Sequence, residues 1–138
     1  MGFSLFFNFD GTCKEAAEFY ARVFESEVQG LMTFDEMPPD PDYDMPEEDL
    51  GKIAYCNVPV YGFNVMLSDL PSNMKLVVGN NISPVVSRPN EDEVRRLFDA
   101  LGEGGTVDME LQKTFWSNLY GMVTDRFGIG WQVMVDEA

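Results

Sequence analysis

The chain has 138 residues, with 24 acidic and 9 basic side chains, no histidine and a net charge of −15. This length suits a single domain, 1–138, whose core is large enough to fold without disulfide or metal cross-links. The charge argues against binding to nucleic acid or to anionic membrane surfaces, and the missing histidine excludes Ser-His-Asp and Cys-His catalysis and His-ligated zinc.

The first half of the chain predicts a strand, a helix and three further strands. An apolar run over Phe3–Phe9 indicates a buried strand, and Thr12 with Glu15 has the pattern of a capping box at a helix start. One buried stripe follows at helical spacing, formed by Ala16, Phe19, Tyr20, Val23 and Phe24. The further strands are expected over Val28–Phe34, Lys52–Val60 and Phe63–Asp69.

The segment Asp35–Gly51 differs from its surroundings. It holds eight acidic residues, four prolines and no basic residue. Proline and like-charge repulsion both oppose regular packing, so a long surface loop is expected. Two interpretations stay open: a solvated connector, or a lid over a pocket or a rim that attracts cations.

The second half predicts the same order of elements. Lys75–Ser87 contains strand material, and Asn90 with Glu93 again indicates a helix start. The helix stripe consists of Val94, Leu97, Phe98 and Leu101. Gly102–Gly105 ends the helix, and Thr106–Gln112 is expected to be a strand.

A hairpin closes the chain. Its strands are expected over Asn118–Thr124 and Ile129–Val135, joined by a turn at Asp125–Gly128 in which Gly128 can adopt a positive φ. Because neighbours on a strand face opposite sides, Trp131 is expected under a helix if Gln132 faces the concave side.

The two halves repeat at a spacing of roughly 75 residues, which indicates one supersecondary unit used twice. Module 1 is expected over about 1–72 and module 2 over about 73–138. The predicted fold is α+β: two βαβββ modules form a cupped mixed/antiparallel sheet with the helices on its outer face. The concave side is then the natural place for a ligand.

Several motifs resemble the PhnB-like branch of the vicinal oxygen chelate superfamily, which includes glyoxalase I, bleomycin-resistance proteins and extradiol dioxygenases. The matching residues are Asn8–Gly11, Ala16, Phe19–Tyr20, Leu97–Leu101, Gly104–Gly105, Gln112, Thr114–Trp116, Gly121–Gly128 and Trp131. The resemblance implies paired βαβββ modules and commonly a homodimer. We expect no methyltransferase activity, because no Gly-rich strand-to-helix turn is visible.

In metal-using members of that superfamily, four inward side chains hold a divalent ion. Carried over by spacing, these positions fall near Leu5, Leu67, Ser83 and Gln132, with Asp69 two residues beyond Leu67. Leucine cannot ligate, so no cofactor is expected. If a divalent metal is bound, Asp69 and Gln132 with waters are the ligands that this comparison leaves.

The ligand-cavity candidates are therefore Leu5, Phe7, Leu67, Asp69, Ser83, Trp116 and Gln132. Strand alternation places Leu5 and Phe7 on one face, which gives an apolar wall if that face is concave. Trp116 either closes one end of the core or lines the pocket with an aromatic face. No catalytic residue is assigned; Tyr120 is one of several candidate proton donors.

Three functional hypotheses follow. The favoured one is a PhnB-like, glyoxalase/bleomycin-resistance-type homodimer that binds a small, largely apolar molecule without covalent chemistry. The second is a metal-assisted lyase, isomerase or dioxygenase, and the third a structural or regulatory dimer. Two cysteines, no signal peptide and no apolar run long enough for a membrane span predict a cytoplasmic protein with reduced thiols.

Overall fold

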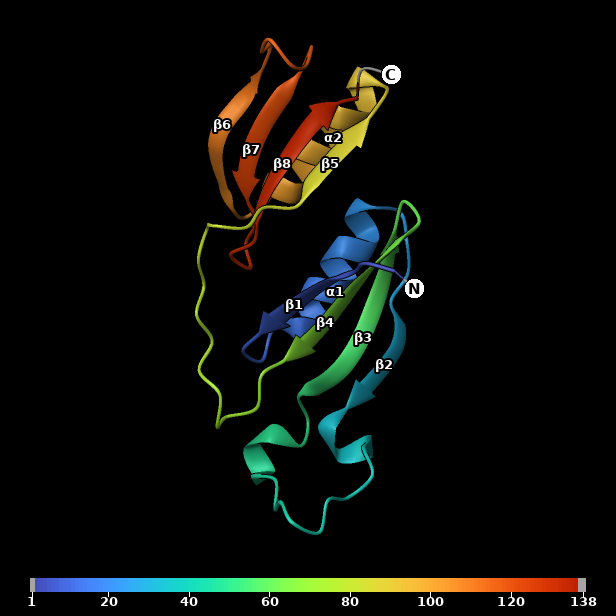
Figure 1. The fold of residues 1–138 in the computed structure, drawn as a ribbon, viewed down its shortest axis with the longest axis vertical. Helices are drawn as coiled ribbons and strands as arrows, with labels where there is room; N and C mark the ends of the chain where they lie inside the picture. The colour runs from blue at the N-terminus through green and yellow to red at the C-terminus, as the bar shows by residue number, and fades with distance from the viewer. Residues whose placement is uncertain (1, 137–138) are drawn as a thin grey trace. The chain divides into compact units, whose positions relative to one another are not determined.

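The computed structural model describes residues 2–136, and the chain divides into two compact units, Met1–Val77 and Val78–Ala138. Unit 1 contains β1 (Leu5–Phe9), α1 (Cys13–Val23), β2 (Gln29–Thr33), β3 (Ile53–Val60) and β4 (Phe63–Asp69). Unit 2 contains β5 (Val85–Arg88), α2 (Glu91–Gly102), β6 (Thr106–Gln112), β7 (Tyr120–Thr124) and β8 (Gly130–Val135). The predicted α+β fold with two βαβββ modules is confirmed (Figure 1).

The strands form two open four-stranded sheets, one in each unit. The orders are β1-β4-β3-β2 and β5-β8-β7-β6. In each sheet the first strand of the unit runs parallel to the last, while the other neighbours are antiparallel. The two sheets therefore have the same topology, as expected for a duplicated unit.

Each unit buries one face of its sheet under its own helix. The rings of Phe7 on β1 and Tyr20 on α1 are 5.9 Å apart, and β7 and β8 bury Val123, Trp131 and Val133 against α2. We call the other side of each sheet, turned away from the unit's own helix, its helix-free face. In unit 2 it carries Val85, Tyr120, Met122, Gln132 and Met134, which alternate with the buried residues.

The capping box predicted at Thr12 is wrong. The Thr12 side chain makes no capping hydrogen bond, and its backbone is not extended, with φ −108° and ψ 9°. Asp69, at the end of β4, supplies the acceptor instead, because its carboxylate accepts the backbone N–H of Cys13 at 3.0 Å. A residue 56 positions away thus replaces the local cap. The cap predicted at Asn90 is confirmed, since its side chain accepts the N–H of Glu93.

Other boundaries differ modestly from prediction. The region Lys75–Ser87 was expected to contain strand material, but β5 begins only at Val85 and ends at Arg88, because Asn80, Asn81 and Pro84 interrupt the segment before it. The acidic segment is a loop with two short 3-10 helices, η1 (Phe34–Glu36) and η2 (Glu47–Asp49). Gly128 has φ +94°, as its turn position predicted.

Candidate functional site

Gln132 lies on β8, on the helix-free face of unit 2. The hydroxyl of Tyr120 on β7 donates to Gln132 Oε1 over 2.6 Å. This hydrogen bond fixes the amide so that its nitrogen points away from Tyr120. The structure describes no partner for that nitrogen among residues 2–136, so two N–H donors remain available on this face.

Aromatic rings extend from Tyr120 toward solvent. The rings of Trp116 and Tyr120 are 5.2 Å apart and edge-to-face, and those of Phe115 and Trp116 are 4.7 Å apart. Exposure rises along this series from 7% at Tyr120 to 47% at Trp116 and 97% at Phe115. Half-exposed Trp116 therefore presents an apolar surface against the ring of Tyr120, whose hydroxyl bonds the Gln132 amide. Apolar and aromatic surface with a few polar groups is the usual composition of a small-molecule site.

Ser117 holds the loop that carries Trp116. Its hydroxyl contacts the carbonyl oxygens of Leu119 at 2.8 Å and Val135 at 2.9 Å, and it is 2% exposed. The loop is thus fastened to the end of β8. Sequence reasoning missed Ser117, because a serine between a tryptophan and a strand has no distinctive pattern. The sequence offers one weak indication of this role: Ser117 is a small polar residue directly after Trp116.

Trp131 supports β8 from the other side. It is 3% exposed on the face under α2, opposite Gln132, as the alternation predicted. Its indole N–H donates to Asp125 Oδ2 over 2.8 Å, and Asp125 Oδ1 also accepts the N–H of Phe127 and of Ile129. The turn and the buried tryptophan therefore fix the position of β8, and with it Gln132.

Three of the predicted cavity residues lie on the helix side of unit 1. Phe7 and Leu67 are cross-strand partners, 8% and 0% exposed, and Leu5 pairs with buried Val65. Phe6 and Met66 form the corresponding pair on the helix-free face. Two positions carried over by spacing, Leu5 and Leu67, therefore lie on the helix side of their sheet, whereas Gln132 lies on the helix-free face of its own.

Ser83 lies in unit 2, just before β5. A Cβ added to Gly130 would be 3.8 Å from the Ser83 hydroxyl, which places the serine beside the start of β8. The next residue, Pro84, accepts the N–H of Gln132 at 3.0 Å. Ser83, Trp116 and Gln132 thus all belong to unit 2, with Ser83 beside the start of β8 and Trp116 against Tyr120, which pairs with Met134 near the end of β8. Leu5, Phe7, Leu67 and Asp69 belong to unit 1.

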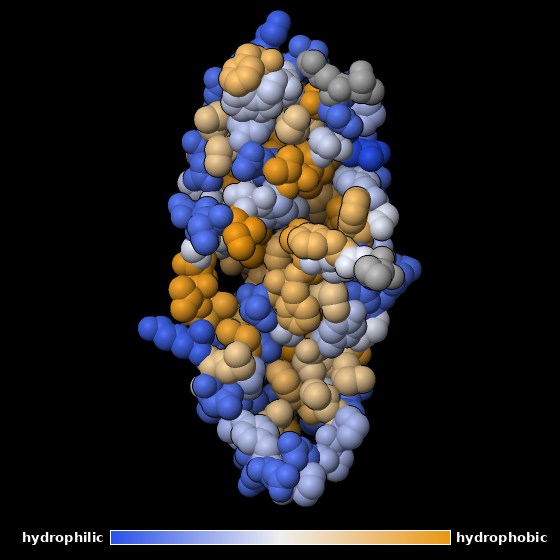
Figure 2. All heavy atoms as spheres, viewed as in Figure 1, coloured by the Kyte–Doolittle hydropathy of each residue, from blue (hydrophilic) through white to orange (hydrophobic). Residues whose placement is uncertain are grey.

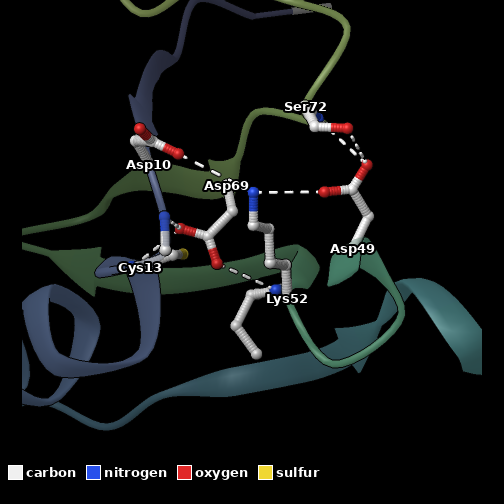
Figure 3. A network of polar contacts seen from close by, with 8 residues as sticks. Asp10, Cys13, Asp49, Lys52, Asp69 and Ser72 are labelled. Carbon is white, nitrogen blue, oxygen red and sulfur yellow. Dashed lines mark hydrogen bonds and ion pairs between the residues drawn. The ribbon is translucent and has the colours of Figure 1, made fainter. Parts of the chain in front are cut away.

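Asp69 accepts hydrogen bonds from three backbone N–H groups in separate segments of unit 1 (Figure 3). Its Oδ1 accepts the N–H of Gly11 at 2.8 Å and of Cys13 at 3.0 Å, and its Oδ2 accepts that of Ile53 at 2.9 Å. The residue is 2% exposed. Its oxygens are therefore used to join β4 to the starts of α1 and β3.

These contacts decide whether Asp69 and Gln132 can hold the divalent ion that metal-using members of the superfamily bind. Both Asp69 oxygens are occupied by backbone N–H groups, and Gln132 Oε1 accepts the Tyr120 hydroxyl. Within the range 2–136, no three His, Cys, Asp or Glu side chains are grouped to hold an ion. The donor set therefore does not fit a divalent metal.

Cys13 and Cys56 are buried free thiols whose sulfurs are 3.9 Å apart. The hydrogen bond with Cys56 and burial both raise the pKa of the Cys13 thiol. Both residues are 0% exposed, so they serve as small core residues.

A family model described as 3-demethylubiquinone-9 3-methyltransferase matches residues 2–134. The chain belongs to this family. Protein YjdN of Escherichia coli K12 is 32% identical over 98% of this chain and 95% of its own. The crystal structure of PA1353 from Pseudomonas aeruginosa has a TM-score of 0.89 and 30% identity, covering 100% of this chain and 99% of that one.

Two further solved structures share this fold at lower sequence identity. A protein from Bacillus cereus, named as a putative 3-demethylubiquinone-9 3-methyltransferase and PhnB protein, has a TM-score of 0.80 and 24% identity over 99% and 100% of the chains. The fosfomycin resistance protein FosX of Listeria monocytogenes shares the fold alone, with a TM-score of 0.66 and 7% identity over 97% and 91%. The resemblance to the PhnB-like branch of the vicinal oxygen chelate superfamily is confirmed.

Proposed function

We propose that this member of the PhnB-like family binds a small, largely apolar, planar molecule on the helix-free face of unit 2, without covalent chemistry. The observation that carries the proposal is the combination of Trp116, Tyr120 and Gln132. A half-exposed indole offers stacking area, and the oriented amide offers N–H donors. The expected ligand therefore combines a flat apolar body with an acceptor oxygen.

The proposal includes neither metal-assisted chemistry nor methyl transfer. The donor set argues against the first, as described above. For the second, the turn from β1 to α1 contains one glycine, Gly11, and the turn from β5 to α2 contains none. Neither turn has the Gly-rich sequence that brings a nucleotide-like cofactor close to a helix N-terminus. The proposed role is recognition of the ligand.

A matched pair of probes tests the proposal. The probe 2-acetylnaphthalene has a flat apolar body and an acceptor oxygen, whereas 2-ethylnaphthalene lacks the oxygen. We expect thermal stabilisation and tighter binding with the ketone, by about tenfold, because only the ketone can accept from the Gln132 amide. Equal affinity for the two probes would contradict the role given to Gln132.

Variants locate the site. Trp116→Ala should weaken binding of the ketone by about tenfold through lost stacking area, and Trp116→Phe should restore most of it. Gln132→Ala should remove the preference for the ketone. Phe63→Ala, at a 69% exposed aromatic residue of unit 1, is the control and should leave affinity unchanged. An effect of Phe63→Ala as large as that of Trp116→Ala would place the ligand elsewhere.

We further propose that the chain is a cytoplasmic homodimer. The segment between β4 and β5 exposes several apolar side chains, including Val77 at 81%, Val78 at 62% and Ile82 at 76% (Figure 2). Surfaces of this kind usually mark protein contacts. Among the described residues, no helix is long and apolar enough to cross a membrane. Light scattering coupled to size-exclusion chromatography tests the dimer, and a monomer at micromolar concentration would contradict it.

A further inference from the structure

The acidic loop lines a cavity that is partly open to solvent and that the proposed function does not use. It lies within unit 1 and has a volume of about 510 Å³. Its lining is mostly apolar and aromatic and includes three carboxylates: Phe34, Met37, Pro38, Pro39, Tyr43, Met45, Leu50, Asp35, Asp40 and Asp44. A volume of this size lies within the usual range for sites that hold small organic molecules.

The base of the loop is fixed by hydrogen bonds and an ion pair. Backbone N–H groups of Phe34 and Asp35 donate to the carbonyl oxygens of Lys52 and Leu50, each at 3.0 Å. Asp49, which is 0% exposed, accepts the Ser72 N–H at 3.0 Å and hydroxyl at 2.8 Å and pairs with Lys52 at 3.1 Å (Figure 3). The two ends of the loop are thus held together beneath the cavity.

The walls of the cavity are soft and polarisable. Phe34, Met45 and Leu50 are half-buried, and Met37 and Tyr43 are 43% and 40% exposed at the rim. Aromatic faces attract cations, and methionine side chains adapt to ligands of varied shape. These walls suit an organic body better than a bare, hydrated ion.

All charged side chains that line the cavity are acidic. No basic residue occurs between Asp35 and Gly51. Asp35 is bonded to the Thr33 hydroxyl, and Asp40 accepts the N–H of Asp42 at 2.9 Å, whereas Asp44 has no partner in the described part of the chain. Together with the net charge of −15, these groups favour a positively charged occupant.

We propose that this cavity binds a small organic ammonium ion with an apolar body. The apolar walls and aromatic rings would contact the body of the ligand, and the carboxylates would neutralise its charge without a fixed coordination geometry. A neutral apolar molecule would leave the carboxylates without a counter-charge. A metal ion would gain nothing from Phe34, Tyr43 and the methionines.

The test compares two isosteres, (4-hydroxyphenyl)trimethylammonium and 4-tert-butylphenol, which differ in charge but hardly in shape. Each is titrated into the ¹⁵N-labelled full chain while amide chemical shifts are followed. We expect shifts confined to residues 34–50, and an affinity at least about tenfold higher for the ammonium compound. Equal affinities, or shifts spread over the whole acidic surface, would overturn the proposal.

Three variants separate the cavity from the general negative field. Asp44→Asn and Tyr43→Ala should each weaken binding of the ammonium compound by about threefold to tenfold. Asp42→Asn removes the same charge from a loop residue outside the lining and should change affinity by less than about 1.5-fold. Equal losses of affinity in Asp42→Asn and Asp44→Asn would overturn the proposal. A lysine-rich peptide that shifts the amide signals of the loop would also overturn it if the ammonium compound does not shift them.

Discussion

The helix-free faces of the two units differ although the units share one topology. In unit 1 the polar side chains bond to each other: Asn57 donates to Asn64 at 3.3 Å and to Gln29 at 3.4 Å, and Ser68 donates to Asn8 at 3.3 Å. In unit 2 the corresponding face carries Tyr120, Gln132 and the nearby Trp116, with N–H donors still available. The difference teaches that two units with one topology can carry different side chains on the same face, and the proposed site rests on those of unit 2.

Both scaffolds use a buried aspartate to fix strand ends. Asp69 accepts three backbone N–H groups in unit 1, and Asp125 accepts two backbone N–H groups and the Trp131 indole in unit 2. Each is 2% exposed. A buried acidic residue in this chain is therefore a structural acceptor, even at positions where a family comparison suggested a ligand to a metal.

The largest effect is expected for Asp69→Ala. The change leaves three backbone N–H groups without an acceptor, and those of Cys13 and Ile53 are buried, so unit 1 should lose about 3 kcal/mol or more of stability. Urea unfolding followed by circular dichroism measures the loss. Asp10→Asn is the control, since its side chain is 72% exposed and its ion pair with Lys52 spans 3.7 Å. Similar losses in the two variants would contradict the structural role of Asp69.

The next effect concerns packing in unit 2. A Cβ on Gly121 would lie 2.6 Å from Phe98 Cε2 and 3.0 Å from Leu111 Cδ2. Gly121→Ala should therefore force α2 away from β7 and cost about 1–3 kcal/mol. Gly51→Ala is the matched control, because nothing lies within 4 Å of its Cβ position. A neutral Gly121→Ala would show that the helix can move freely on the sheet.

Acid should weaken unit 1 through Asp49. Hydrogen bonds from the Ser72 N–H and hydroxyl, together with Lys52, lower the pKa of Asp49 from its ordinary 3.8. The folded chain thus binds this proton less tightly than the unfolded one, so the contribution is present above pH 3.8 and is lost as the pH falls through the folded pKa.

Comparing the urea midpoints of wild type and Asp49→Asn at several pH values tests this point. The wild type should be more stable at neutral pH, and the difference should shrink below pH 3.8. Asp44→Asn, at an exposed aspartate of the same loop, serves as the control and should show no such convergence. A difference independent of pH would mean that the Asp49 effect is steric.

The smallest effect is expected for Tyr120→Phe. The ring stays against Trp116, but the 2.6 Å hydrogen bond to Gln132 is lost and the amide can rotate. Affinity for 2-acetylnaphthalene should fall by about twofold to fivefold, which corresponds to one net hydrogen bond. An unchanged affinity would show that the tyrosine does not orient the amide.

Much of the fold could be predicted from local patterns, while the contacts that position the site could not. Periodicity located both helices, and alternation placed Trp131 and Gln132 on opposite faces. The structural role of Asp69 could not be predicted, because its partners lie up to 58 residues away in sequence. The face on which Leu67 lies could not be predicted, because spacing counted from a motif cannot fix strand register to one residue.

One measurement tests the central claim most directly: the two indole N–H signals of the ¹⁵N-labelled protein during titration with 2-acetylnaphthalene. The account predicts that the Trp116 signal and the Gln132 side-chain amide signals shift together in a saturable way. The Trp131 signal, buried and bonded to Asp125, should stay in place. Saturable shifts confined to unit 1, or none at Trp116 and Gln132, would contradict a ligand site on the helix-free face of unit 2.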